Sequence, residues 1–351
     1  MRVIFRVDAS LQMGTGHVMR CLTLAQALKE NGEDVEFICR KHKGNLIEKI
    51  YSSGFNVHEL KVFKEVDFDN KLAHSHWLGV TQQQDADDCI NTLKKEKIDW
   101  LIVDHYAIDE DWQCKLKPYY NKLMVIDDLA DRKHQCDILL DQAFGRQQED
   151  YSGRTPEGCE LLLGSKYALL RPEFSEWREF SLEQRSKPKF KQLLINMGGA
   201  DPDNITGKVI EKLQTINLLK DVMITIVMGE IAPHLRSVRS CASKLLYCSE
   251  VKVSVDNMAE IIANTDIAIG ASGSTTWERC CLGVPTIQLI TAYNQEFIAQ
   301  KLNEINAIKL VEIDDIVENL ENFQYWMKDV GKNASKVTNG NGVKAVLECL
   351  L

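Results

Sequence analysis

A histidine that follows a glycine-rich turn is the residue in this chain whose surroundings most favour chemistry. The run that starts at Arg2 is rich in β-branched and aromatic residues and stops at Asp8. The turn Gly14-Thr15-Gly16 leads directly to His17, and apolar residues then recur at helical spacing as far as Leu28. This pattern predicts a strand, a tight turn and a helix with an imidazole at its start.

The start of a helix favours anions and disfavours cations. Its first N–H groups have no intrahelical partners and carry positive partial charge, so phosphates bind there. The same field disfavours the imidazolium form, and we expect His17 to stay neutral near pH 7 and able to accept a proton. A neutral base beside a phosphate site suggests chemistry on a phosphorylated substrate. The alternative is that His17 only caps the helix, since the turn matches neither the dinucleotide fingerprint nor the Walker spacing.

A second candidate site lies in the motif Gly270–Pro285, where a buried strand ends in small hydroxyl residues and a helix begins. Backbone N–H groups and the hydroxyls of Ser274 and Thr275 can hold a pyrophosphate without a metal. Glu278 lies about one turn into the helix, where a carboxylate can bind two ribose hydroxyls. A solvated helix start would explain the acid through the helix dipole, but it would not explain the small hydroxyl residues.

Alternating strands and helices must position these residues. In the first half, the helical patterns lie near 44–53, 84–96 and 109–117, between strand-like runs. Those runs are Val35–Cys39, Phe55–Leu60, Trp100–Val103, Leu123–Ile126 and Ile138–Leu140. The alternation predicts a parallel sheet wrapped by helices.

A second cycle of the same kind follows a charged segment, Trp177–Lys191. It opens with the strand Gln192–Met197 and the turn Gly198–Asp201, and Pro202 lies where a proline would start a helix. Further strands are expected at 222–228, 251–255, 265–269 and 285–289. We expect an α/β protein of two doubly wound, Rossmann-like domains that face each other across a cleft. The predicted domains are 1–180 and 190–351, joined by a linker at about 181–189.

Composition restricts the class of protein. The 351 residues carry a net charge of −9, which argues against nucleic acid as a partner. No stretch approaches the roughly 18 uninterrupted apolar residues of a membrane-spanning helix. Because the first strand begins at Arg2, we expect no signal peptide, no membrane partner and a cytoplasmic location. The 11 cysteines include no C-x-x-C pair, so we expect reduced thiols, no metal and no cofactor.

Taken together, the motifs resemble a known family over about residues 1–305. The turn after Asp266–Ile269, with Glu278 and Leu282-Gly283-Val284-Pro285, is similar to the UDP-binding half of the GT-B fold in MurG-type glycosyltransferases. The other motifs resemble the PseG family, the UDP-2,4-diacetamido-2,4,6-trideoxy-β-L-altropyranose hydrolases of pseudaminic acid biosynthesis. They are Phe5–Ser10, Gly14–Arg20, Asp104-His105-Tyr106, Ile126–Asp128, Cys136–Leu140, Ala168–Arg171, Asn196–Asp201 and Tyr293–Glu296.

The resemblance implies a reaction and a role for His17. His17 would be the general base that activates a water for attack on the anomeric carbon of a UDP-linked amino sugar. The C1–O bond would break, and UDP would leave with inversion. Two alternatives stay open, namely a GT-B glycosyltransferase that passes the sugar to an acceptor and a nucleotide-sugar binding protein without activity. We expect a monomer, because a cleft between two domains needs no partner.

The resemblance also implies a set of binding residues. Contacts to the sugar or the phosphates are expected from Gly14, Gly16, Tyr106, Arg171, Asn294 and Gln295. For Tyr106 a packed aromatic role, and for Arg171 a structural role, are the alternatives. Contacts to UDP are expected from Gly198, Gly199, Met228, Val255, Met258, Ser274, Thr275 and Glu278. Of the two adjacent acids Asp127 and Asp128, which must point to opposite faces, we expect at most one to face substrate. Asp104 could orient His105 or cap a turn. The other histidines, His74 and His134 among them, are expected at the surface.

Overall fold

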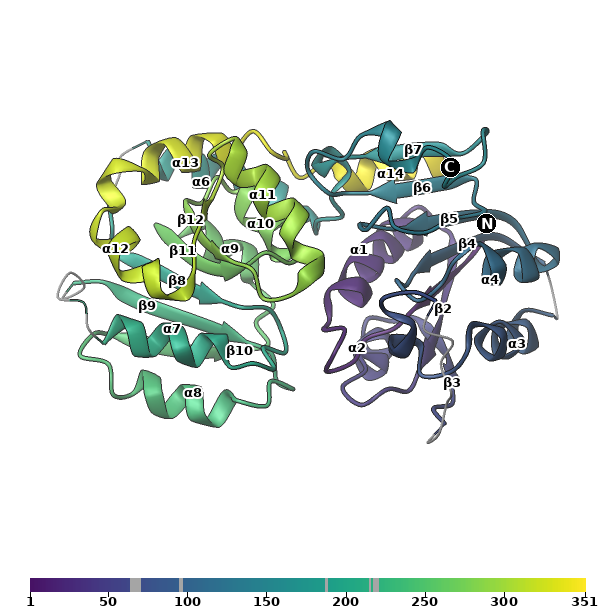
Figure 1. The fold of residues 1–351 in the computed structure, drawn as a ribbon, viewed down its shortest axis with the longest axis horizontal. Helices are drawn as coiled ribbons and strands as arrows, with labels where there is room; N and C mark the ends of the chain where they lie inside the picture. The colour runs from purple at the N-terminus through teal and green to yellow at the C-terminus, as the bar shows by residue number, and fades with distance from the viewer. Residues whose placement is uncertain (64–70, 95–96, 187–188, 215, 217–220) are drawn as a thin grey trace. The chain divides into compact units, whose positions relative to one another are not determined.

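The computed structural model describes residues 1–63, 71–94, 97–186, 189–214, 216 and 221–351. The chain divides into two compact units. The first unit comprises Met1–Leu169 together with Val343–Leu351, and the second unit comprises Leu170–Gly342. Each unit is built on one parallel sheet, and the two units are described separately below (Figure 1).

The sheet of the first unit has seven strands in the order β3-β2-β1-β4-β5-β6-β7. Their bounds are β1 Arg2–Val7, β2 Asp34–Arg40, β3 Asn56–Leu60, β4 Ile98–Asp104, β5 Tyr120–Ile126, β6 Ile138–Asp141 and β7 Glu160–Leu163. The central strands are buried on both faces, as expected for a parallel sheet with helices on each side.

The helices of the first unit form two layers. On one face, α1 (Gly16–Glu30), α2 (Ile47–Ser52) and α14 (Gly342–Leu350) pack against residues such as Phe5 and Ile102. On the other face, α3 (Gln82–Leu93) and α4 (Glu110–Leu116) pack against residues such as Ile4 and Leu101. The alternation of side chains along β1 and β4 thus supplies both layers of the core.

The sheet of the second unit has six strands in the order β10-β9-β8-β11-β12-β13. Their bounds are β8 Gln192–Asn196, β9 Met223–Met228, β10 Ser249–Val253, β11 Ile267–Ala271, β12 Thr286–Leu289 and β13 Lys309–Leu310. The helices are α5 Pro172–Glu176, α6 Arg178–Gln184, α7 Ile205–Leu213, α8 Leu235–Ala242, α9 Met258–Ala263, α10 Thr275–Cys281, α11 Glu296–Glu304, α12 Ile316–Glu321 and α13 Met327–Ala334. Helices α7, α8, α12 and α13 share one core with the strands.

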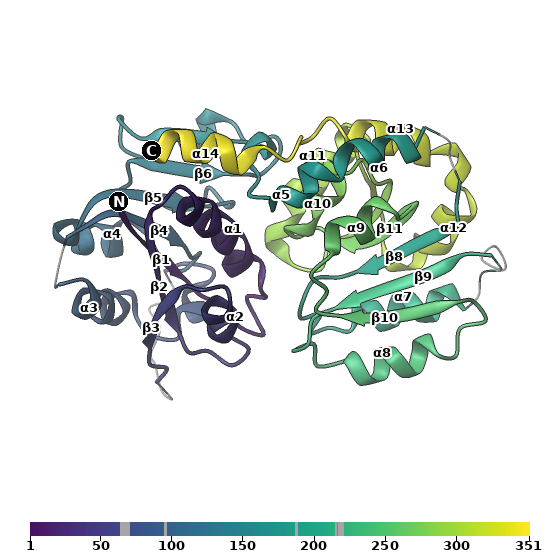
Figure 2. The same cartoon turned by 180° about the vertical axis from the view of Figure 1, so that it is seen from behind.

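The division into units differs from the expected boundaries of 1–180 and 190–351 in two ways. The second unit already begins at Leu170, and α6 occupies the start of the segment expected as a linker. The last helix, α14, returns to the first unit and lies along β6 in both ribbon views (Figures 1 and 2). Val346 and Leu350 are buried in that core, and the indole N–H of Trp100 donates to the carbonyl of Leu350 at 3.2 Å.

The predicted strands are confirmed in their predicted order, with small shifts at their ends, and the short edge strands β7 and β13 were not predicted. The start of α7 differs more, because Pro202 is not its first residue. Instead, the carboxylate of Asp201 accepts hydrogen bonds from the backbone N–H groups of Ile205 and Thr206 at 2.8 and 2.9 Å, which fixes the helix start three residues later.

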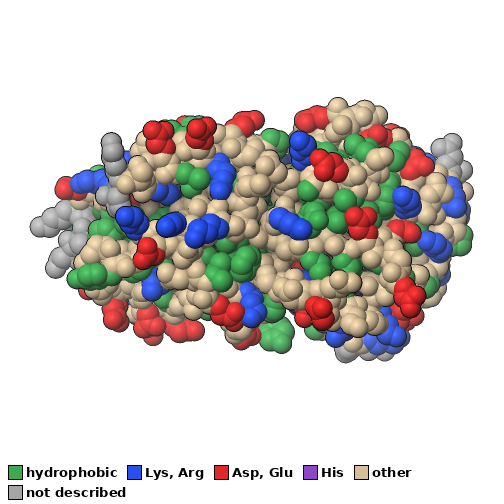
Figure 3. Space-filling view, turned by 90° about the horizontal axis from the view of Figure 1, so that it is seen from above, with side chains coloured by type: hydrophobic (Ala, Val, Ile, Leu, Met, Phe, Trp, Pro, Cys, Tyr) green, Lys and Arg blue, Asp and Glu red, His purple; other side chains and the backbone are tan. Residues whose placement is uncertain are grey.

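The surface agrees with an acidic protein of mixed charge. Lys and Arg side chains are interspersed with Asp and Glu side chains over the face shown in Figure 3. Among the described residues, no helix is both long and apolar enough to cross a membrane.

Candidate active site

Charged residues gather where three neighbouring strands of the first unit end. Strand β1 ends before Asp8, β4 ends at Asp104, and β5 ends before Asp127 and Asp128. Helix α1 begins beside them, so that His17 is its second residue. Because all strands are parallel, their carboxyl ends share one edge of the sheet, where ligands of doubly wound folds bind.

His17 is almost fully buried at this edge. Its Nε2 lies 4.0 Å from Oδ1 of Asp104, and its ring meets the edge of the Tyr106 ring with centroids 4.6 Å apart. Burial lowers the pKa of His17 to about 4, and the nearby Arg20 guanidinium adds to this effect, while Asp104 opposes it. His17 is therefore a neutral imidazole near pH 7, as expected, although burial rather than the helix field is the main cause.

A buried ion-pair network lies beneath His17. The guanidinium of Arg20 donates to both carboxylate oxygens of Asp104, at 2.7 and 2.8 Å, and to Asp128 as well. The Tyr106 hydroxyl donates to Asp128 at 2.9 Å. Burial alone would raise the pKa of Asp104, but the charge and hydrogen bonds of Arg20, together with His17 and Cys21, hold that pKa below its usual value. The network fixes Tyr106 and the first turns of α1 beside His17.

The neighbouring acids and His105 have structural partners. The Asp127 carboxylate accepts hydrogen bonds from the Arg132 guanidinium at 2.8 Å and from the backbone N–H of Ala130 at 2.9 Å. Of the two adjacent acids, Asp128 alone joins the network of Tyr106. The expectation that Asp104 orients His105 is wrong, because His105 Nε2 lies 3.3 Å from Asp8 and Asp104 holds Arg20.

The turn before α1 is shaped by two glycines. Gly14 has a φ of +75°, a conformation that favours glycine, and its N–H donates to the carbonyl of Ser10 at 2.9 Å. A Cβ built on Gly14 would meet nothing within 4 Å, so the turn is open on that side. Gly16 is the first residue of α1.

In the second unit, the residues predicted to contact the phosphates lie at the turn between β11 and α10. Ser274 is exposed at the start of α10, and its hydroxyl makes no capping hydrogen bond. Thr275 accepts a hydrogen bond from Arg279 at 3.0 Å. Oε2 of Glu278 is buried without a hydrogen-bond partner, and burial raises the pKa of Glu278 to about 7, an effect that Arg171 opposes. A buried carboxylate oxygen without a partner is a ready acceptor for a ligand hydroxyl.

Other predicted UDP contacts follow neighbouring strands of the same sheet. Gly198 and Gly199 follow β8, and Gly198 has a φ of +92°. Met228 is the buried last residue of β9, and Gly229 after it is packed so closely that a Cβ there would lie 2.2 Å from the Gly199 carbonyl oxygen. Gly229 was not among the residues predicted from the sequence, although it lies directly after a strand and beside the predicted Met228.

The remaining candidates of the second unit lie near this edge or brace it. Val255 follows β10, and the buried Met258 begins α9. Arg171 donates to the carbonyl of Asp256, in the same loop, at 3.2 Å. A Cβ on Gly273 would lie 3.9 Å from the side-chain nitrogen of Gln295, which places that amide beside the turn before α10. Asn294 precedes it in the short helix η5 (Tyr293–Gln295) and is partly exposed.

The predicted residues therefore form two groups. His17, Gly14, Gly16 and Tyr106 belong to the first unit, and the other candidates belong to the second unit. Across the described residues, no group of three or more His, Cys, Asp or Glu side chains is arranged to hold a metal ion.

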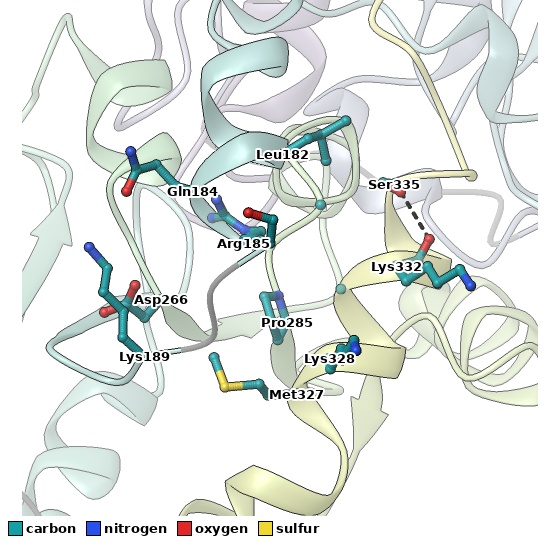
Figure 4. Close-up of a pocket in the computed structure, with 13 residues that line it drawn as sticks. Leu182, Gln184, Arg185, Lys189, Asp266, Pro285, Met327, Lys328, Lys332 and Ser335 are labelled. Carbon is teal, nitrogen blue, oxygen red and sulfur yellow. Dashed lines mark hydrogen bonds between the residues drawn. The ribbon is translucent and has the colours of Figure 1, made fainter.

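A separate pocket of about 300 Å³ lies in the second unit (Figure 4). Its residues Lys189, Asp266 and Pro285 precede β8, β11 and β12, so the pocket is at the amino ends of the strands. None of the predicted site residues lines it.

Comparisons with known proteins find relatives that match most of this chain. No family model matches it. It is 29% identical over 300 residues to the UDP-2,4-diacetamido-2,4,6-trideoxy-beta-L-altropyranose hydrolase of Campylobacter jejuni, and the match covers 85% of this chain and 95% of that protein. It is 27% identical over 293 residues to an uncharacterized protein of Methanocaldococcus jannaschii, which covers 82% of this chain but only 55% of that longer protein. The chain thus spans about half the length of this second relative.

The fold has a close counterpart among solved structures. MurG of Acinetobacter baumannii matches with a TM-score of 0.70 over 99% of both chains, at 14% sequence identity. This likeness confirms the GT-B-like class predicted from the sequence. The chain therefore has a GT-B-like fold, and its sequence is similar to that of the Campylobacter jejuni hydrolase.

Proposed function

We propose that the protein hydrolyses a UDP-linked 2,4-diacetamido-2,4,6-trideoxy sugar, of the β-L-altro configuration, to UDP and the free sugar. The observation that carries the proposal is His17, a neutral base held at the carboxyl edge of the first sheet by a buried ion-pair network. The named activity of the Campylobacter jejuni relative supports the substrate class.

The reaction needs one base and a bound leaving group. The His17 imidazole accepts a proton from a water molecule whose oxygen attacks C1 of the sugar. The bond between C1 and the phosphate oxygen breaks, and its electron pair leaves with UDP, so the configuration at C1 inverts. Positioned general-base catalysis contributes about 10²- to 10⁴-fold, and placement of the reactants lowers the barrier further.

The second unit supplies the binding of UDP in this proposal. The free hydroxyl of Ser274 and the N–H groups of the turn before α10 receive the diphosphate and spread its charge. The unpartnered oxygen of Glu278 receives a ribose hydroxyl. The reaction itself then requires only that the sugar reach His17.

A glycosyltransferase is the second candidate, because the fold is shared with MurG. It would use the same nucleotide contacts but would need an acceptor. A binding protein without activity would need the nucleotide contacts alone and no base at position 17.

The test is release of UDP from UDP-2,4-diacetamido-2,4,6-trideoxy-β-L-altropyranose without any acceptor, in ¹⁸O-water. We expect stoichiometric UDP and free sugar with the label on the C1 hydroxyl. Label on the UDP phosphate would mean P–O cleavage and would refute the role of His17. UDP release that depends on an added acceptor would favour the transferase, and tight UDP-sugar binding without release would favour the binding protein.

A further inference from the structure

A cluster of aromatic rings beside His17 has no part in the proposed acid–base chemistry. The short helix η1 (Ser75–Leu78) carries Trp77, whose ring stacks on Tyr106 with centroids 5.9 Å apart and planes at 26°. The His74 ring packs on the same indole with centroids 4.2 Å apart, and the centroids of the Trp77 and His17 rings are 6.4 Å apart. An indole is therefore held within reach of any group that contacts the proposed base.

The segment that carries Trp77 is firmly anchored. Leu78 and Val80 are buried in the core of the first unit. Between them, Gly79 has a φ of +73°, and a Cβ there would lie 2.6 Å from Cε1 of His42. The Ser75 hydroxyl accepts a hydrogen bond from the N–H of Leu72 at 3.1 Å. These contacts fix the orientation of the indole, as a binding surface requires.

The two stacked rings differ in exposure. Tyr106 is buried, with 4% of its surface exposed, and its hydroxyl is held by Asp128. Trp77 above it is only partly buried. Part of the indole is thus accessible while the ring beneath it is fixed.

The chemistry of the cluster favours an uncharged ligand with apolar groups. Burial lowers the pKa values of His17 and His74 and raises that of Tyr106, so all three rings are neutral near pH 7. The nearby cation Arg20 is paired with Asp104 and Asp128. Neutral aromatic faces bind C–H and methyl groups through apolar contact rather than phosphates.

We propose that Trp77 is a specificity-determining residue that packs against the apolar substituents of the sugar. This inference rests on the proposed function, because the sugar must lie beside His17 for hydrolysis. The methyl group at C6 and the acetamido methyl groups are the parts of such a sugar that an indole recognises. Trp77 therefore selects deoxy, N-acylated sugars over sugars with a hydroxymethyl group.

The test compares the affinities of UDP and of the UDP-linked diacetamido-trideoxy sugar by calorimetry, in a His17→Asn background that leaves the sugar uncleaved. Trp77→Ala should weaken binding of the UDP-sugar about tenfold, the range expected for one aromatic contact. It should leave the affinity for UDP alone unchanged. Trp77→Phe should retain most of the affinity. Trp177 is a partly buried tryptophan of the second unit, and as a control Trp177→Ala should change neither affinity.

Two further comparisons decide the outcome. Trp77→Ala should reduce the preference for the diacetamido sugar over UDP-N-acetylglucosamine, and with His17 intact it should raise KM more than it lowers kcat. Equal losses for UDP and UDP-sugar, or no loss for either, would overturn the inference. If the wild-type protein releases no UDP but the affinity difference at Trp77 is found, the hydrolase proposal fails and the sugar-binding role of Trp77 stands.

Discussion

Burial determines the protonation states of the His17 imidazole and the Glu278 carboxyl group. Burial lowers the pKa of His17 to about 4 and raises the pKa of Glu278 to about 7. Each shift favours the neutral form, as the loss of hydration requires. For a general base the neutral form is the active one, whereas a ribose-binding carboxyl works best when ionised. Near pH 6, His17 is therefore in its active form, whereas Glu278 is mostly in the protonated form that binds ribose less well.

The pH dependence of turnover tests His17. In a Glu278→Gln background, kcat/KM should stay level from pH 8 to about 5 and fall as the pH approaches 4, because protonation removes the base. Between pH 5 and 8, His17→Asn should lower kcat by about 10²- to 10⁴-fold. Circular dichroism at each pH serves as the folding control. A fall centred near the ordinary histidine value of about 6.5 would contradict the buried, neutral state.

The pH dependence of UDP binding tests Glu278. Ribose hydroxyls donate to the ionised carboxylate, so UDP affinity should rise as the pH increases through about 7 and level off above it. Glu278→Ala should weaken UDP binding by roughly 1–3 kcal/mol, the usual loss for an unpaired ligand hydroxyl. The phosphate of UDP also titrates near pH 6, so Glu278→Gln is the matched control. Calorimetry that gives the same pH profile for both proteins would refute the ribose contact.

At the scale of elements, the close approach of two strand-end turns shapes the predicted UDP site. A Cβ on Gly229 would lie 2.2 Å from the carbonyl oxygen of Gly199, which is a backbone clash that no side-chain motion can relieve. Gly229→Ala should therefore displace the turn after β8 and weaken UDP binding at least about tenfold, with a stability cost of about 1–3 kcal/mol. Gly158→Ala is the control, since its Cβ meets nothing within 4 Å. Unchanged UDP affinity in a folded Gly229→Ala variant would remove this turn from the site.

Local patterns predicted the interior of elements better than their ends. The buried runs of β2, β4 and β5 consist mostly of apolar residues, and these strands lie within a few residues of the expected ranges. The start of α7 was missed because the side chain of Asp201 caps it. The position of α14 was missed because contacts such as Trp100 to Leu350 join residues 250 positions apart.

The same limit applies to the candidate site. Its turns follow strands, and its base lies at the start of the helix after the first turn, so the local sequence pattern indicates them. Spacing does not indicate the partners that hold these residues, because partners such as Arg20 and Asp104 are 84 positions apart in the sequence. His74 was expected at the surface, but it is half-buried, and its ring lies 5.6 Å from that of Tyr106, which is 32 positions away in the sequence. His134, also expected at the surface, is buried at 2% exposure and pairs with Gln113.

At the scale of the whole molecule, the predicted roles are divided between the two units. The candidate base and its aromatic neighbours belong to the first unit, and the predicted nucleotide contacts belong to the second. UDP alone should therefore bind without involving the first unit. A complete UDP-sugar should involve both units.

Hydrogen exchange can separate these two binding events. In the His17→Asn variant, UDP alone should slow exchange in the turns after β8, β9 and β11, where backbone N–H groups meet the ligand. The intact UDP-sugar should give the same protection and should also slow exchange at Gly14–Arg20 and in η1. Glu278→Ala is the binding control, because this substitution should reduce the protection that UDP gives to the second unit. Equal protection of Gly14–Arg20 by UDP alone would mean that the first unit binds the nucleotide, and the division of roles proposed here would be wrong.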